Sequence, residues 1–138
     1  MIMQEMRRIQ AIREWLELNH NRVLGHSEGL YVVCDGLDPS KRKWYHVDEQ
    51  DHRVYQRNLK FAGDFHDGIA AVEDPSGWFH IYRDGTEVYS GRSRYFSDRK
   101  LLVVALEEKA KAEMAAKAAL EEEAARAKNN LVEATVQG

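Results

Sequence analysis

The spacing of apolar residues divides the chain into three zones. In the first zone they recur every three or four residues, at Ile2, Met6, Ile9, Ile12 and Leu16. This spacing predicts an amphipathic helix. The middle zone alternates short apolar runs with turns that contain Gly or Pro, a pattern typical of β-strands. The last zone is rich in Ala, Glu and Lys, which favours a long helix. We therefore expect an α+β fold with four segments: a helix over 1–20, a β domain over 21–96, a helix over 97–130 and a disordered tail over 131–138.

The β zone contains an internal repeat. Trp44-Tyr45-His46-Val47 aligns with Trp78-Phe79-His80-Ile81 at an offset of 34 residues, whereas the upstream acid–Gly pairs lie 39 apart. In each repeat unit an acid–Gly turn leads into a buried strand, then a loop and an aromatic strand. A third strand ending in Val54-Tyr55 or Val88-Tyr89 would complete a small antiparallel sheet of hairpin units. The repeated structural positions are Gly29, Trp44, His46, Gly68, Trp78, His80 and Gly85.

These residues resemble the WG repeat, a bacterial β-repeat family. The second unit fits the family pattern from Phe65-His66-Asp67-Gly68 through Gly77-Trp78-Phe79-His80-Ile81 to Asp84-Gly85. The first unit departs from it at Asp51, where Gly is usual. The resemblance covers roughly residues 23–96. It implies repeat-built β structure with a binding role and no reaction.

Composition narrows the function classes. The chain has 138 residues and a net charge of −3, which argues against a dedicated nucleic-acid binder. A single cysteine, Cys34, excludes an intramolecular disulfide and a Cys-rich zinc site. The sequence shows no export signal, and its longest apolar run, residues 101–106, is too short to cross a membrane. We therefore expect a cytoplasmic protein without a membrane partner.

Residues that could bind a metal or act as a nucleophile are present, but their spacing matches no specific motif. His46 and His80 hold equivalent positions and could meet across adjacent strands, with Asp48 or His66 as a further metal ligand. A histidine copied by a repeat is more often structural, so a metal-binding or hydrolytic domain stands as the alternative interpretation. Cys34 lies in an apolar strand, where burial disfavours a reactive thiolate. We expect no catalytic residue, no metal and no cofactor.

A non-catalytic interaction module that binds a protein partner is the favoured function. Aromatic side chains are frequent anchors of protein interfaces, and a basic cluster precedes the first aromatic strand. The expected interaction surface is Lys41, Arg42, Lys43, Tyr45 and Phe79. Nucleic acid is a less favoured ligand for this cluster because acids outnumber bases in the same zone.

The C-terminal zone supports a third hypothesis, an oligomerising structural protein. Residues 101–106 fit either a decayed repeat strand or the first turns of a helix, and a helix with Ser97 as its N-cap is favoured. Beyond Ala110 the apolar positions are mostly Ala, which makes a weak coiled-coil seam. We expect a monomer or a weak oligomer formed through this helix.

Overall fold

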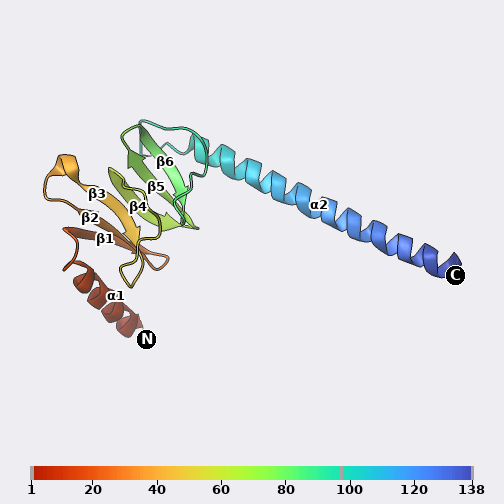
Figure 1. Cartoon of the computed structure of the whole chain (residues 1–138), viewed down its shortest axis with the longest axis horizontal. Coiled ribbons are helices and arrows are strands. Elements are labelled where there is room, and N and C mark those ends of the chain that lie inside the picture. The colour runs from red at the N-terminus through yellow and green to blue at the C-terminus, as the bar shows by residue number, and fades with distance from the viewer. Residues whose placement is uncertain (1, 97, 138) are drawn as a thin grey trace. The chain divides into compact units, whose positions relative to one another are not determined.

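A computed structural model describes residues 2–96 and 98–137, with the side chains described as far as residue 132. The chain forms two compact parts, Met1–Arg99 and Lys100–Gly138. The first part holds one α-helix and six strands, and the second is a single helix (Figure 1). The elements are α1 (Ile2–Leu16), β1 (Arg22–Ser27), β2 (Leu30–Asp35), β3 (Lys43–Val47), β4 (Phe61–His66), β5 (Ile69–Asp74), β6 (Gly77–Tyr82) and α2 (Lys100–Gln137), with a short 3-10 helix at Pro39–Lys41.

Helix α1 uses only the C-terminal half of its apolar stripe for packing. Leu16 is fully buried and Ile9 and Ile12 pack against the core, whereas the apolar side chains near its start are exposed. The Arg13 guanidinium donates hydrogen bonds to the carbonyl oxygens of Val23 (3.0 Å) and Leu24 (3.2 Å) in β1. The helix is therefore tied to β1, an edge strand of the first sheet, through Arg13, and it ends at Leu16 rather than at residue 20.

The six strands form two antiparallel three-stranded sheets, β1-β2-β3 and β4-β5-β6. The acid–Gly pairs form the tight turns between the first two strands of each sheet. Glu28 and Gly29 have φ of 55° and 76°, and Asp67 and Gly68 have φ of 52° and 77°. Two consecutive left-handed residues match the twist of an antiparallel hairpin. The expected α+β architecture is confirmed, and each repeat unit supplies a sheet of its own.

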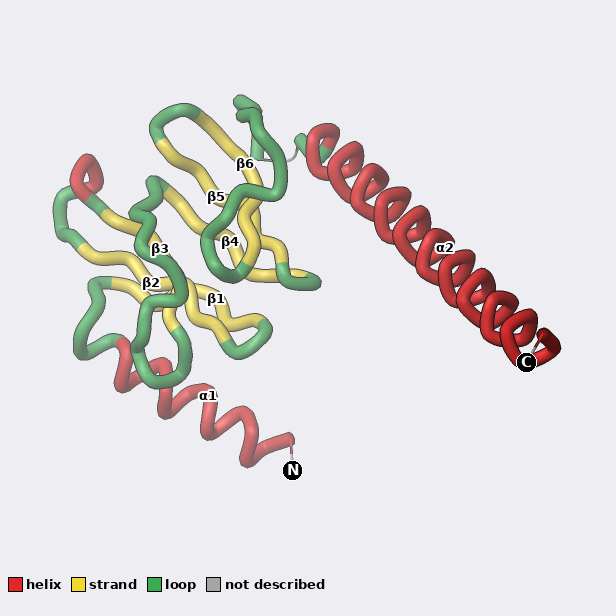
Figure 2. The backbone as a smooth tube through the Cα atoms, turned by 45° about the vertical axis from the view of Figure 1, so that its right-hand side comes forward, coloured by secondary structure: helices red, strands yellow, loops and turns green. Residues whose placement is uncertain are grey.

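The third strand of each unit differs from the sequence prediction. It lies before the acid–Gly turn, as β1 and β4, instead of at Val54-Tyr55 and Val88-Tyr89. After β3 and β6 the described chain makes isolated bridges instead of a third strand, Val47↔Arg53 and Trp44↔Leu59 in the first unit and Ile81↔Glu87 and Trp78↔Ser93 in the second. The two-residue turn explains the difference, because it brings the residues on both of its sides into register as paired strands. The segments after β3 and β6 run as long loops over the sheets (Figure 2).

The core is continuous between the two sheets. Strand β4 contacts all three strands of the first sheet, so the second unit packs against the first. Buried side chains from both units form one cluster that includes Tyr31, Phe65, Phe79 and Ile81. Two units that are short on their own therefore share one hydrophobic core, as repeat architectures require.

The C-terminal part is the helix α2 alone. It includes residues 101–106, which are therefore helical rather than strand, and it extends to Gln137 through most of the segment expected to be a disordered tail. Ser97, the expected N-cap, lies outside the described residues. Glu122 and Arg126, four residues apart on α2, form an ion pair at 3.1 Å. Within the described residues, neither helix has a stretch long and apolar enough to cross a membrane.

Candidate functional site

A histidine–tyrosine hydrogen bond is repeated in both units. The Nδ1 atom of His46 lies 2.6 Å from the Tyr55 hydroxyl, and Nδ1 of His80 lies 2.6 Å from the Tyr89 hydroxyl. In the first unit, Nε2 of His46 also lies 2.7 Å from the Gly63 carbonyl oxygen of β4. A carbonyl only accepts hydrogen bonds, so Nε2 carries the proton and Nδ1 accepts from Tyr55. Burial lowers the pKa of His46 to about 4, so the ring is neutral.

The structure places His46 and His80 in separate hydrogen-bonded pairs rather than at a common site. Both ring nitrogens of His46 are engaged, and Asp48, one of the two expected further ligands beside His66, accepts hydrogen bonds from the backbone of Gln50 and His52. No group of three or more His, Cys, Asp or Glu side chains is placed to hold a metal ion in the part of the chain that the structure describes. His80 bonds within its own unit, whereas His46 also connects the first unit to β4 of the second.

A buried histidine that the sequence interpretation did not single out joins α1 to the first sheet. His20 follows α1, and its ring nitrogens lie 2.7 Å from Asp35 and 2.7 Å from Asp51. The Tyr45 hydroxyl donates to the second oxygen of Asp35 at 2.5 Å, and the Arg53 guanidinium lies 3.9 Å from the centre of the Tyr45 ring. Both ring nitrogens of His20 therefore face a carboxylate oxygen.

The charge of His20 depends on these contacts. Burial lowers its pKa, but the hydrogen bonds from its ring to Asp51 and Asp35 outweigh that effect, and the net pKa is raised. Asp51 has φ of 64°, at the turn position that Gly85 occupies in the second unit with φ of 88°. The departure from Gly at Asp51 was the available sequence signal for this cluster. With both ring nitrogens of His20 in hydrogen bonds, the cluster joins the end of α1 to β2 and to the turn at Asp51.

The expected interaction surface is only partly exposed. Lys41 and Lys43 are exposed and Arg42 is half-buried, whereas Tyr45 and Phe79 are buried. Including Tyr45 and Phe79 in an exposed surface was therefore wrong. Alternation along β3 and β6 did not reveal this, because guanidinium groups cover both rings: Arg53 covers Tyr45, and Arg92 lies 3.7 Å from the centre of the Phe79 ring.

Four aromatic rings form a ladder through the two units. The ring centroids of Trp44 and Phe61 are 5.0 Å apart, those of Phe61 and Trp78 5.8 Å, and those of Trp78 and Phe96 5.0 Å. Trp44 is buried, Phe61 and Trp78 are half-buried, and Phe96 is 59% exposed, next to Tyr95 at 68%. We call Trp78, Tyr95 and Phe96 the terminal aromatic patch. It is an exposed aromatic surface that lies at the end of the repeat.

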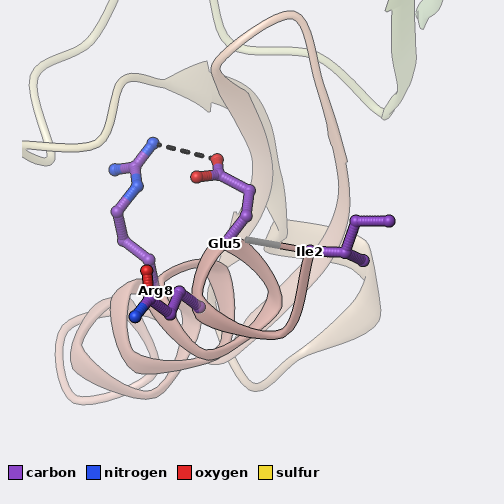
Figure 3. Close-up of a pocket in the computed structure, with 4 residues that line it drawn as sticks. Ile2, Glu5 and Arg8 are labelled. Atoms are coloured by element: carbon purple, nitrogen blue, oxygen red, sulfur yellow. Dashed lines mark hydrogen bonds and ion pairs between the residues drawn. The ribbon is translucent and has the colours of Figure 1, made fainter.

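A shallow hollow beside the start of α1 is less suited to a ligand. It is lined by Ile2, Gln4, Glu5 and Arg8. Figure 3 shows the Arg8 guanidinium turned toward the Glu5 carboxylate, at 3.4 Å. Arg8 also binds Glu49 through two hydrogen bonds of 2.7 and 2.9 Å. The charges of this hollow are therefore paired within the protein itself.

Comparison with known proteins adds no relative. No protein-family profile, curated protein or solved structure matches the chain. The repeat is nevertheless visible in the structure itself, because the strands, bulges, turns and His–Tyr pairs of the two units correspond. The resemblance to the WG repeat accordingly stays a prediction.

Proposed function

We propose that the chain is a non-catalytic β-repeat module that binds a protein partner through the terminal aromatic patch. The observation that carries the proposal is the aromatic ladder. Phe61 has an indole on each of its two sides, whereas Phe96 contacts Trp78 and presents the rest of its ring to solvent. Exposed aromatic rings beside a packed core are frequent anchors of protein interfaces.

Equivalent residues of the two units support the same surface. Tyr55 and Leu59 of the first unit are buried, whereas their counterparts Tyr89 and Ser93 are half-buried. The backbone bridges are the same in both units, since Trp44 pairs with Leu59 and Trp78 pairs with Ser93. The first unit is thus covered by the second, while the same side of the second unit is less covered.

The state of the polar core also supports a binding role over a catalytic one. His20 and His46 have both ring nitrogens in hydrogen bonds. Cys34 is fully buried, and burial raises the pKa of its thiol, which disfavours a nucleophilic thiolate. We propose a cytoplasmic location on the sequence grounds given above, and at most weak self-association through α2, whose apolar positions are mostly Ala.

Photo-crosslinking tests the proposal at the patch itself. A photoreactive phenylalanine analogue replaces Phe96 in the native host, and a matched control places it at Leu37, an apolar side chain that is 85% exposed in the first unit. The captured protein is then purified and its affinity measured for the wild type, Phe96→Ser and Leu37→Ser. We expect Phe96→Ser to weaken binding at least about 10-fold and Leu37→Ser to leave it unchanged. Equal capture at both positions, or equal affinity of both variants, would overturn the proposal.

A further inference from the structure

The contact between the two repeat units shows which side chains pack against a unit on the side that the next unit covers. The Arg57 guanidinium of the first unit forms an ion pair with the Glu87 carboxylate of the second unit, at 3.6 Å. The Phe61 ring that opens β4 lies between the indoles of Trp44 and Trp78. The inner interface therefore combines tilted aromatic contacts with a guanidinium that faces a carboxylate.

The terminal aromatic patch offers the aromatic and basic half of this combination. At an offset of 34 residues, Arg94 and Tyr95 align with Lys60 and Phe61, so a basic residue again precedes an aromatic one. Phe96, one position further, takes the place against Trp78 that Phe61 holds against Trp44. The exposed side of the Phe96 ring corresponds to the side of the Phe61 ring that contacts Trp78. The segment therefore begins a further repeat that the chain does not complete as β structure, since α2 starts at Lys100.

The charges around the patch are basic and available. Arg94 and Arg99 flank the two exposed rings in the sequence, and both side chains are exposed. The structure gives neither of them a carboxylate partner among the residues whose side chains it describes. The neighbouring acid, Asp98, is already engaged, because it accepts a hydrogen bond from the Ser93 hydroxyl at 2.9 Å. Two exposed arginines thus flank the exposed rings of the patch in the sequence.

We infer that the occupant of this patch is an acidic, aromatic segment of a different protein. An aromatic ring of that segment packs against the exposed side of Phe96, as Trp78 packs against Phe61. Its flanking carboxylates bind Arg94 and Arg99, as Glu87 binds Arg57. This inference rests on the proposed function and names the chemistry of its partner.

A second copy of this chain fits the patch less well. A two-fold contact would bring Arg94 and Arg99 of both copies together, and like charges in an interface oppose association. Head-to-tail stacking would need the Leu24 carbonyl, the counterpart of the Gly63 carbonyl that His46 binds. Arg13 of the same chain already occupies the Leu24 carbonyl. Both modes of self-association therefore meet a specific obstacle.

A peptide titration of the full chain tests the inference. The probe is the synthetic peptide Glu-Glu-Gly-Trp-Phe-Glu-Glu, and the controls replace its Trp by Ala or its Glu residues by Lys. Binding is followed by amide and indole NMR shifts, which detect affinities as weak as about 1 mM. We expect shifts at Trp78, Tyr95 and Phe96, at least about 10-fold weaker binding for either control peptide, and loss of binding in the Arg94→Glu/Arg99→Glu variant. Arg7→Glu, an exposed charge on α1, is the matched control.

Four results would overturn the inference. They are an absence of shifts, shifts of equal size with the lysine peptide, tighter binding of an oligothymidine at the same residues, and a concentration-dependent dimer in sedimentation that Phe96→Ser abolishes. The oligothymidine result would assign the patch to nucleic acid, and the dimer would assign it to a second copy. Capture of a purified partner at Phe96 that lacks an acidic aromatic segment would leave the proposed function standing while this inference fails. Peptide binding without any capture at Phe96 would leave this inference standing while the proposed function fails.

Discussion

The single variants Tyr55→Phe and Tyr89→Phe remove the same type of His–Tyr hydrogen bond from two different environments. Both hydroxyls lie 2.6 Å from Nδ1 of a histidine. The His46–Tyr55 pair is covered by the second unit, whereas Tyr89 in the equivalent pair is half-buried. We expect Tyr55→Phe to reduce the free energy of unfolding more than Tyr89→Phe does, because water can reach only the second site.

The expected magnitudes follow from the partners that remain. Nε2 of His46 donates to Gly63, so the ring cannot turn to satisfy Nδ1 without losing that bond. A buried acceptor left without a partner costs about 1–3 kcal/mol. At His80, water can replace the lost hydroxyl, which leaves a net loss of about 0.5–1 kcal/mol. At the middle of the two ranges, the variants should therefore differ by about 1 kcal/mol.

Urea unfolding followed by tryptophan fluorescence measures this difference. Trp15, Trp44 and Trp78 are the only tryptophans, and all lie in the Met1–Arg99 part, so the signal does not report α2. With an m-value of about 1–1.5 kcal/mol/M, Tyr55→Phe should lower the midpoint by about 0.7–3 M. Equal midpoints for the two variants, or a larger loss for Tyr89→Phe, at unchanged m-value, would refute the reasoning.

Three further predictions concern pH, the aromatic ladder and the turns. Because the pKa of His46 falls from 6.5 to about 4 on folding, stability should drop by about 3 kcal/mol as pH falls from 6.5 to 4, and His46→Gln should flatten that profile in urea titrations. Trp44→Ala should cost about 3–5 kcal/mol in the same assay and Trp78→Ala distinctly less, because only the first ring is buried; equal losses would count against the ladder geometry. Gly29→Ala should cost about 1 kcal/mol for its left-handed backbone alone, whereas Gly85→Ala should cost more and lower the thermal midpoint further, because its Cβ would lie 2.6 Å from that of Tyr55; an equal loss would mean that the contact relaxes.

The repeat was predictable because its signals are local. The acid–Gly pairs specify a two-residue turn, and the matching aromatic strands show that one unit is copied. The position of the third strand was not predictable in the same way. Arg22–Ser27 alternates poorly, and a bulge between Val23 and His26 interrupts its register. Such a strand is recognised by the partner it pairs with, not by its own pattern.

The environment of polar and aromatic side chains was harder to predict than the strands. His20 lies in a polar run after α1, and only the fold brings Asp35 and Asp51 to its two nitrogens. Tyr45 and Phe79 lie on aromatic strands where either face could be exposed, and the arginines that cover them come from other segments. These contacts connect residues that the sequence pattern treats independently.

Because Arg13 binds the edge of β1, further repeat units could be added only after the second unit. An edge strand with free carbonyls invites pairing with other chains, and here a guanidinium from α1 occupies two of those carbonyls. A duplication of residues 60–93 inserted after Ser93 would keep α1 in place and carry Phe96 one unit further along. Arrays of different length could thus arise from this chain by tandem duplication alone, each with the same blocked start and the same aromatic terminus.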